Sequence, residues 1–141
     1  MQLWLLLALF FGLVLAGCGS TPPSPESVVR AWSQELNDGD NQGAAKLFAP
    51  GAKIVQAGTT IRLDTQAQAV AWNAALPCSG TIVSIKTKGD TTTATFVLGD
   101  RRERKCDGPG ERATAIVRVN EGKIVLWHQT SAAPAPVGPA V

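Results

Sequence analysis

The spacing of the hydrophobic residues changes along the chain between that of helices and that of strands. The order of these changes is the strongest constraint on the fold. From residue 25 onward, Val28, Trp32 and Leu36 recur at the spacing of an amphipathic helix. Beyond Cys78 the pattern becomes that of strands rich in Ile, Val and Thr, which span residues 81–88, 91–98, 112–119 and 123–130. Helices followed by hairpin-linked strands predict one α+β domain over residues 25–130, with a curved, mainly antiparallel sheet packed on the helices.

Capping and turn residues set the expected boundaries of these elements. The helix starts are Ser24-Pro25, Asp40-Asn41 and the capping box Thr65-x-x-Gln68, and the helix ends are Asn37-Asp38-Gly39, Pro50 and Pro77. The second helix is expected to include Phe48. Strands within residues 53–64 flank Gly58-Thr59, which predicts a hairpin there. The predicted order of elements is α-α-β-β-α-β-β-β-β.

Three segments carry a resemblance to a known family. They are Val28-Val29-Arg30-Ala31-Trp32, Ala44-Ala45-Lys46-Leu47-Phe48-Ala49-Pro50, and the pair Ala115–Val119 and Gly122–Trp127. Together with the element order, they resemble the nuclear transport factor two-like superfamily, also called SnoaL-like or the cystatin-like α+β cone. The resemblance implies a bent sheet that wraps the long helix around a conical cavity. It also implies a homodimer formed through the outer face of the sheet.

Enzymes of this superfamily place an Asp, His or Tyr inside the cone. Many members carry an acid where this chain has Gly51, and the sequence holds no Tyr at all and no carboxylate between Asp40 and Asp64. His128 is the remaining candidate for a general base, and strand alternation is expected to place it on the face of Ile124 and Leu126. The alternative is a histidine near a strand end that is solvated or bonded to the backbone.

A ligand pocket is the second kind of site that the sequence supports. Its predicted walls are Trp32, Phe48, Trp72, Phe96, Trp127 and His128, which come from five different elements. Aromatic side chains of this kind could hold a flat, small apolar ligand, and ordinary core packing explains them as well. A binding role requires a cavity of roughly 300 Å³ or more.

A basic loop precedes the third cysteine. Its cations are Arg101, Arg102, Arg104 and Lys105. One interpretation is a clamp for an anionic ligand, a cell-wall polymer or a lipid headgroup. The other is a solvated loop, because Asp100, Asp107 and Glu111 offset the charge.

The N-terminus predicts export. Leu3–Ala16 is an unbroken apolar run of 14 residues, which spans about 21 Å as a helix and fits a signal peptide over residues 1–17. Leu15-Ala16-Gly17-Cys18 resembles the lipobox of bacterial lipoproteins, which implies cleavage before Cys18 and attachment of diacylglycerol to its sulfur. Residues 18–24 would then be a lipidated tether on the extracytoplasmic side of the cell membrane. The alternatives are an ordinary signal peptide and a short membrane anchor.

Lipidation of Cys18 would leave two cysteines, Cys78 and Cys106. An even pair in an exported protein predicts a disulfide, and closing a loop of about 29 residues stabilises the fold by roughly 3.6 kcal/mol in the chain-entropy model. Free or metal-binding thiols are the alternative. Residues 131–141, rich in Pro and Ala, are expected to be a disordered tail.

The functional prediction is a membrane-anchored extracytoplasmic lipoprotein that binds a small apolar ligand or an envelope protein without catalysis. A lyase or isomerase of the SnoaL type that uses His128 is the first alternative, and a structural interaction platform in the cell envelope is the second. The net charge of +2 argues against nucleic acid as a partner. No phosphate-binding loop or His-Glu-x-x-His motif occurs, so no cofactor or metal is predicted.

Overall fold

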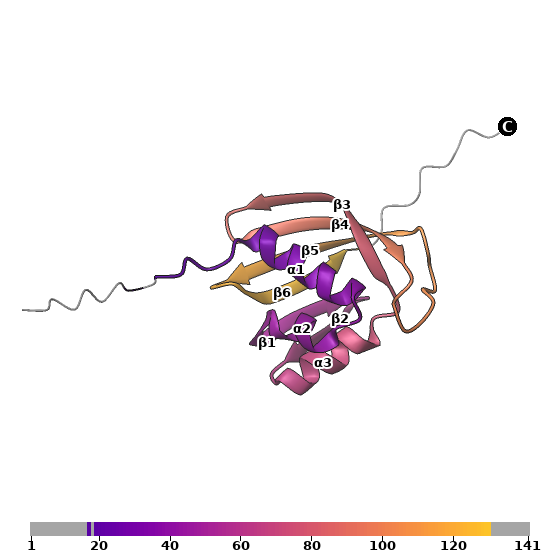
Figure 1. Ribbon diagram of the computed structural model, residues 1–141, viewed down its shortest axis with the longest axis horizontal. Coiled ribbons are helices and arrows are strands. Elements are labelled where there is room, and N and C mark those ends of the chain that lie inside the picture. Colours follow the sequence, from indigo (N-terminus) through magenta and orange to yellow (C-terminus); the bar gives the residue numbers. More distant parts are fainter. Residues whose placement is uncertain (1–16, 18, 131–141) are drawn as a thin grey trace, which may run out of the picture.

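The computed structural model describes residues 17 and 19–130 (Figure 1). The predicted lipidation site Cys18, the tail 131–141 and nearly all of the predicted signal peptide lie outside these residues. The elements are α1 (Pro25–Asn37), α2 (Asn41–Lys46), β1 (Phe48–Gln56), β2 (Thr59–Leu63), α3 (Gln66–Ala75), β3 (Ser79–Lys88), β4 (Thr91–Gly99), β5 (Arg112–Asn120) and β6 (Lys123–Thr130). Their order confirms the predicted one. Within the described ranges, no helix has the length and apolar character needed to cross a membrane.

One six-stranded sheet in the order β2-β1-β6-β5-β4-β3 forms the body of the domain. All neighbouring strands are antiparallel except β1 and β6, which run parallel. The sheet curves around α1, while α2 and α3 lie together beside β1 and β2 (Figure 1). Half-buried residues such as Ile116, Leu126 and His128 lie on the outer face, and no described helix packs there. Pairing of two copies through this face stays a prediction.

The predicted helix caps are confirmed in detail. The Ser24 hydroxyl accepts a hydrogen bond from the backbone N–H of Ser27, with Pro25 in the first turn. Thr65 and Gln68 form a reciprocal capping box at the start of α3. Local sequence fixes these ends because each cap satisfies backbone groups that the helix itself leaves unpaired.

The start of β1 was predicted wrongly. The second helix ends at Lys46, and Phe48 is already the first residue of a strand that runs through Pro50. Between Phe48 and Lys53 the pairing with β6 is irregular, and Gly51 has a φ of +82°. This irregular stretch tolerates a proline because a proline lacks the N–H that a regular ladder would need. The β1–β2 turn is formed by Ala57 and Gly58, one residue earlier than expected.

Trp32 on α1 is the centre of the core. Its ring lies 4.2 Å from that of Trp127 on β6 and 5.9 Å from that of Phe96 on β4, measured between ring centroids. Its indole N–H donates a 2.8 Å hydrogen bond to Asn73 Oδ1 on α3, and Asn73 is fully buried. The indole nitrogen of Trp127, by contrast, is buried without a hydrogen-bond partner among the described residues.

These two tryptophans allow a matched test of that hydrogen bond. Trp32→Phe and Trp127→Phe remove the same number of ring atoms, but only Trp32→Phe leaves a buried amide oxygen, Asn73 Oδ1, unpaired. We expect Trp32→Phe to be the less stable variant by about 2 kcal/mol in the free energy of unfolding, measured by urea titration. Equal stability of the two variants would show that the hydrogen bond contributes nothing.

Candidate functional site

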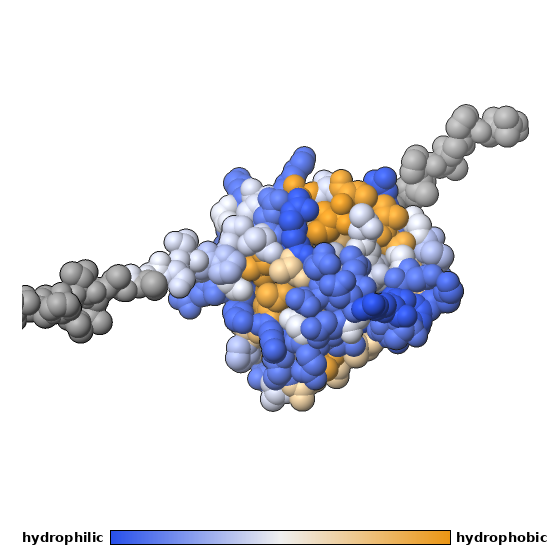
Figure 2. All heavy atoms as spheres, in the orientation of Figure 1, coloured by the Kyte–Doolittle hydropathy of each residue, from blue (hydrophilic) through white to orange (hydrophobic). Residues whose placement is uncertain are grey.

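A cavity of about 220 Å³ lies at the open end of the cone, between α1, the α3–β3 connection and the inner face of β4, β5 and β6. It is lined by Trp32, Ser33, Leu36, Gln56, Leu76, Pro77, Cys78, Ser79, Gly80, Phe96, Leu98, Asp107, Ala113, Thr114, Ala115, Trp127 and Gln129. Apolar side chains also reach the surface of the molecule on the face drawn in Figure 2. The cavity is smaller than the 300 Å³ expected, which restricts it to small ligands.

The structure divides the predicted aromatic residues into two groups. Trp32, Phe96 and Trp127 line the cavity, and their role in binding a ligand stays a prediction. Phe48 and Trp72 do not, because they pack edge to face with ring centroids 5.5 Å apart in the core between β1 and α3. The aromatic set is therefore partly cavity wall and partly ordinary core, so both interpretations of the sequence hold for some members.

His128 lies on the face of the sheet opposite the cavity. The pairing of β5 with β6 shifts register between Arg118 and Val119, which leaves Val125 as an extra residue. Because of this bulge, Ile124 and Trp127 share the inner face, whereas Leu126 and His128 share the outer one. The prediction that His128 shares a face with Ile124 was wrong, and His128 is not among the residues that line the cavity.

Neutral polar groups occupy one wall of the cavity. Gln56 Nε2 donates a 2.7 Å hydrogen bond to Gln129 Oε1, and both side chains line the cavity. Ser33 Oγ donates to the Gly80 carbonyl oxygen at 3.4 Å, and Asn37 Nδ2 donates to the same oxygen at 3.0 Å. These groups can orient a ligand by hydrogen bonding, but none is a strong acid or base.

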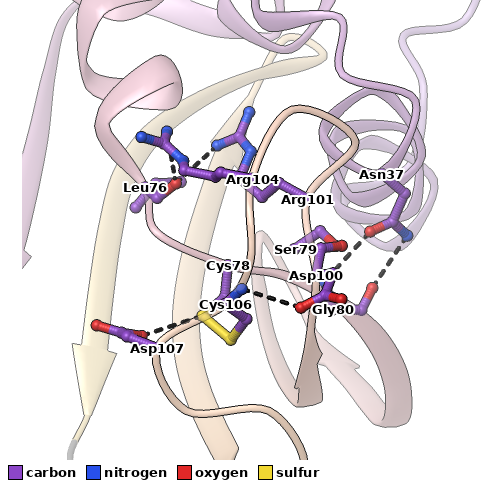
Figure 3. Close-up of a disulfide and its surroundings, with 10 residues drawn as sticks. All are labelled: Asn37, Leu76, Cys78, Ser79, Gly80, Asp100, Arg101, Arg104, Cys106 and Asp107. Carbon is purple, nitrogen blue, oxygen red and sulfur yellow. Dashed lines mark hydrogen bonds between the residues drawn. A yellow bond between two sulfur atoms is a disulfide. The ribbon is translucent and has the colours of Figure 1, made fainter.

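The predicted disulfide between Cys78 and Cys106 is present, with an S–S distance of 2.02 Å (Figure 3). It joins the start of β3 to the connection between β4 and β5, and Cys78 itself lines the cavity. Asp107 Oδ1 lies 3.3 Å from Cys78 Sγ. The two sulfurs and this carboxylate lie within 4.8 Å of one another, but a disulfide removes both thiolates as metal ligands.

Arg101, the first cation of the basic loop, is buried and structural. Its guanidinium donates to the carbonyl oxygens of Asn73 at 2.6 Å and Leu76 at 3.0 Å, and to Asn41 Oδ1 at 2.6 Å. Its Nε lies 2.9 Å from Glu103 Oε1, at ion-pair distance but without hydrogen-bond alignment. Burial lowers the pKa of Arg101, while Glu103 opposes that shift. Arg101 therefore caps the C-terminal end of α3 by binding carbonyl oxygens there.

The other three cations of this loop also have partners within the domain. Arg104 Nη2 donates to the carbonyl oxygen of Leu76 (Figure 3) and to that of Ala74. Arg102 Nη1 donates to the carbonyl oxygen of Asp38 at 3.2 Å. Lys105 Nζ donates to Asp100 Oδ2 at 2.8 Å. Cations near the last carbonyls of a helix stabilise it. The arginines of the loop thus bind carbonyl oxygens at the C-terminal ends of α1 and α3. Neither interpretation of the sequence anticipated this role.

Asp100 and Lys105 shift each other's pKa. The hydrogen bond from Lys105, together with one from the Cys106 N–H, lowers the pKa of Asp100 below 3.8, and the bond to Asp100 raises the pKa of Lys105 above 10.5. The contribution of Asp100 to stability is complete above pH 3.8 and is lost as the pH falls through the lower folded value. That of Lys105 is complete below pH 10.5 and is lost above its higher folded value. Both groups of this ion pair are therefore charged throughout the neutral range.

Sequence reasoning missed the polar lining of the cavity. Gln56 and Gln129 lie 73 residues apart, and only the parallel pairing of β1 with β6 brings them together. Asp107 was noted only as a charge that offsets the basic loop, and its position beside Cys106 was the one available signal. No pattern within a single segment could have identified this set.

Comparisons with known proteins place the fold. No protein-family profile and no curated protein matches the sequence. Among solved structures, an NTF2-like protein of unknown function from Cytophaga hutchinsonii aligns with a TM-score of 0.65 at 12% identity, covering 84% of this chain and 97% of that one. A putative polyketide cyclase from Sinorhizobium meliloti has a TM-score of 0.62 at 15% identity, with 74% and 94% covered.

A third similar structure is a hypothetical protein with a ketosteroid isomerase-like fold from Catenulispora acidiphila, determined in complex with trimethylamine. Its TM-score is 0.62 at 20% identity, with 78% of this chain and 88% of that one covered. At these identities the likeness shows the fold alone. The domain is thus an α+β cone of the NTF2-like fold, which also occurs in polyketide cyclase and ketosteroid isomerase-like proteins.

The role of the basic loop can be tested by substituting two of its arginines, one of which is buried and the other exposed. Arg101→Met keeps the apolar stem but removes the hydrogen bonds of a buried guanidinium and leaves Asn41 Oδ1 without its donor, so we expect a loss of about 3 kcal/mol in the free energy of unfolding. Arg102→Met, at an exposed site, should cost less than about 0.5 kcal/mol. Urea unfolding followed by tryptophan fluorescence measures both. Similar unfolding midpoints for the two variants would contradict the structural role of Arg101.

Proposed function

We propose that this protein is a membrane-anchored lipoprotein of the bacterial cell envelope. Its cone-shaped domain binds a small, largely apolar ligand without catalysing a reaction. The observation that carries this proposal is the cavity of about 220 Å³ with Trp32, Phe96 and Trp127 in its walls. Concave, mainly apolar sites with a few polar groups are typical of small-molecule binding.

The chemistry of the lining favours binding over catalysis. Within the described part of the chain, Asp107 is the only lining side chain that titrates, since Cys78 is held in the disulfide. General acid–base catalysis needs a proton donor or acceptor within hydrogen-bond reach of the substrate, commonly a pair with contrasting environments. His128, the predicted base, belongs to the other face of the sheet. A lyase or isomerase reaction that uses His128 in this cavity is therefore not supported.

Anchoring is supported by the sequence and by the disulfide. The lipobox-like segment Leu15–Cys18 directly precedes a short tether, and α1 begins at Pro25. The disulfide between Cys78 and Cys106 is consistent with an oxidising, extracytoplasmic compartment. The domain would then lie close to the membrane surface, within the reach of a tether of seven residues, 18–24.

Substitution of Cys18 tests the anchor. Cys18→Ser removes the only sulfur that a lipobox could modify, so we expect the protein to leave the membrane fraction of bacterial cells. Ser20→Ala, two residues further along the tether, is the control and should leave the protein in that fraction. Cell fractionation with immunodetection measures both variants. If the Cys18→Ser protein stays in the membrane fraction, another segment holds the protein there.

Filling the cavity tests the binding role. Ala113 is half-buried and lines the cavity, so the larger side chain of Ala113→Leu can extend into it. We expect the purified full chain to bind phenol or 3,3-dimethylbutan-1-ol in calorimetric titrations, and Ala113→Leu to weaken this binding by about tenfold. Ala31→Leu, on the exposed side of α1, is the control and should bind like the wild type. Absence of binding by the wild type would instead favour an interaction platform.

A further inference from the structure

Among the residues that the structure describes, Asp107 is the one charged side chain that lines the cavity. It lies in the connection between β4 and β5, next to Cys106, and it lines the cavity. Among residues 19–130, no Lys, Arg or His forms an ion pair with it. Its Oδ1 lies 3.3 Å from Cys78 Sγ, but a disulfide sulfur has no proton to donate, so this contact does not neutralise the carboxylate (Figure 3).

Three cations that precede Asp107 in the same connection are already engaged elsewhere. Arg101 is paired with Glu103, and Lys105 is paired with Asp100. Arg104 donates to carbonyl oxygens at the end of α3. Asp107 is exposed, so its negative charge is solvated; it has no ion-pair partner among the described residues, and a cation bound in the cavity would supply one.

The apolar walls of the cavity also favour a cation. Trp32, Phe96 and Trp127 form a mutually packed group, with ring centroids between 4.2 and 6.2 Å apart. Each ring carries a negative π face, and a cation within about 6 Å of a ring centroid is attracted to it. In a cavity of about 220 Å³, an occupant contacts several walls at once. Aromatic walls together with one carboxylate are the combination that recognises alkylated ammonium groups.

A primary ammonium group carries three N–H donors, and each of them needs an acceptor once the group is buried. The Gly80 carbonyl oxygen already accepts from Ser33 and Asn37, and Gln129 Oε1 already accepts from Gln56. A quaternary ammonium group needs no acceptors, because its methyl groups bury against the rings while its charge faces the carboxylate. The remaining amide groups of Gln56 and Gln129 can bind a neutral polar substituent such as a hydroxyl.

We propose that the cavity takes small quaternary or tertiary alkylammonium compounds, with the cationic head between the three aromatic rings and Asp107. This inference rests on the proposed binding function, and it names the chemical class of the ligand. It predicts that the positive charge of the ligand, and not only its shape, determines the affinity.

Choline and 3,3-dimethylbutan-1-ol provide the test, because they have the same shape and differ by a quaternary nitrogen in place of a carbon. We expect the purified full chain to bind choline at least about tenfold more tightly than the neutral isostere in calorimetric titrations. Asp107→Asn should remove most of this preference and leave the affinity for the isostere unchanged. Glu111→Gln removes the same charge from the same connection, but outside the lining, so it should preserve the preference.

The outcomes separate this inference from the proposed function. Binding of the isostere with no preference for choline, or a preference that survives Asp107→Asn, would overturn the inference and leave ligand binding in place. An equal loss of preference in Glu111→Gln would show that general surface charge is responsible, which also overturns it. If neither compound binds, both the inference and the binding function fail.

Discussion

The packing of Trp32 against the concave face of the sheet is the interaction on which the rest of the domain depends. Its ring joins α1 to β4 and β6 through Phe96 and Trp127, and its N–H joins α1 to α3 through Asn73. A buried hydrogen bond of this kind fixes the angle between elements more tightly than apolar contact does, because losing it leaves an unpaired group in the interior. The same ring forms a wall of the cavity, so the core and the candidate site share one side chain.

A chain of polar contacts extends from this point to the rim of the cavity. Asn73 accepts from Trp32 through its side chain and from Arg101 through its backbone carbonyl. Arg101 in turn holds the connection between β4 and β5, which the disulfide ties to the start of β3. The charged loop is thus part of the scaffold, and Asp107, which lines the cavity, belongs to the same connection. The cations that stood out in the sequence are bound within the domain, two by carboxylates and two by carbonyl oxygens.

The proposed binding role depends on which side chains this fold places in its cavity. The fold alone does not decide the chemistry, which depends on the titratable groups that face inward. Here the inner face carries Ala113, Ala115 and two glutamine side chains, and the one histidine faces outward. Among the described residues, the ionisable side chains that line the cavity are therefore reduced to one carboxylate, which fits the proposed binding role better than it fits proton transfer.

The sequence alone determined the order of elements, because this order depends on local periodicity. It also determined the helix caps at Ser24 and Thr65, which depend on contacts within one turn, and the disulfide partners, which follow from the number of cysteines. Tertiary structure decided the rest. An extra residue at Val125 reversed the face expected for His128, and an irregular β1–β6 pairing admitted Pro50 into a strand. The burial of Arg101 and the meeting of Gln56 with Gln129 needed partners 28 to 73 residues away. Local patterns cannot specify such contacts, since register and burial are set by the whole sheet at once.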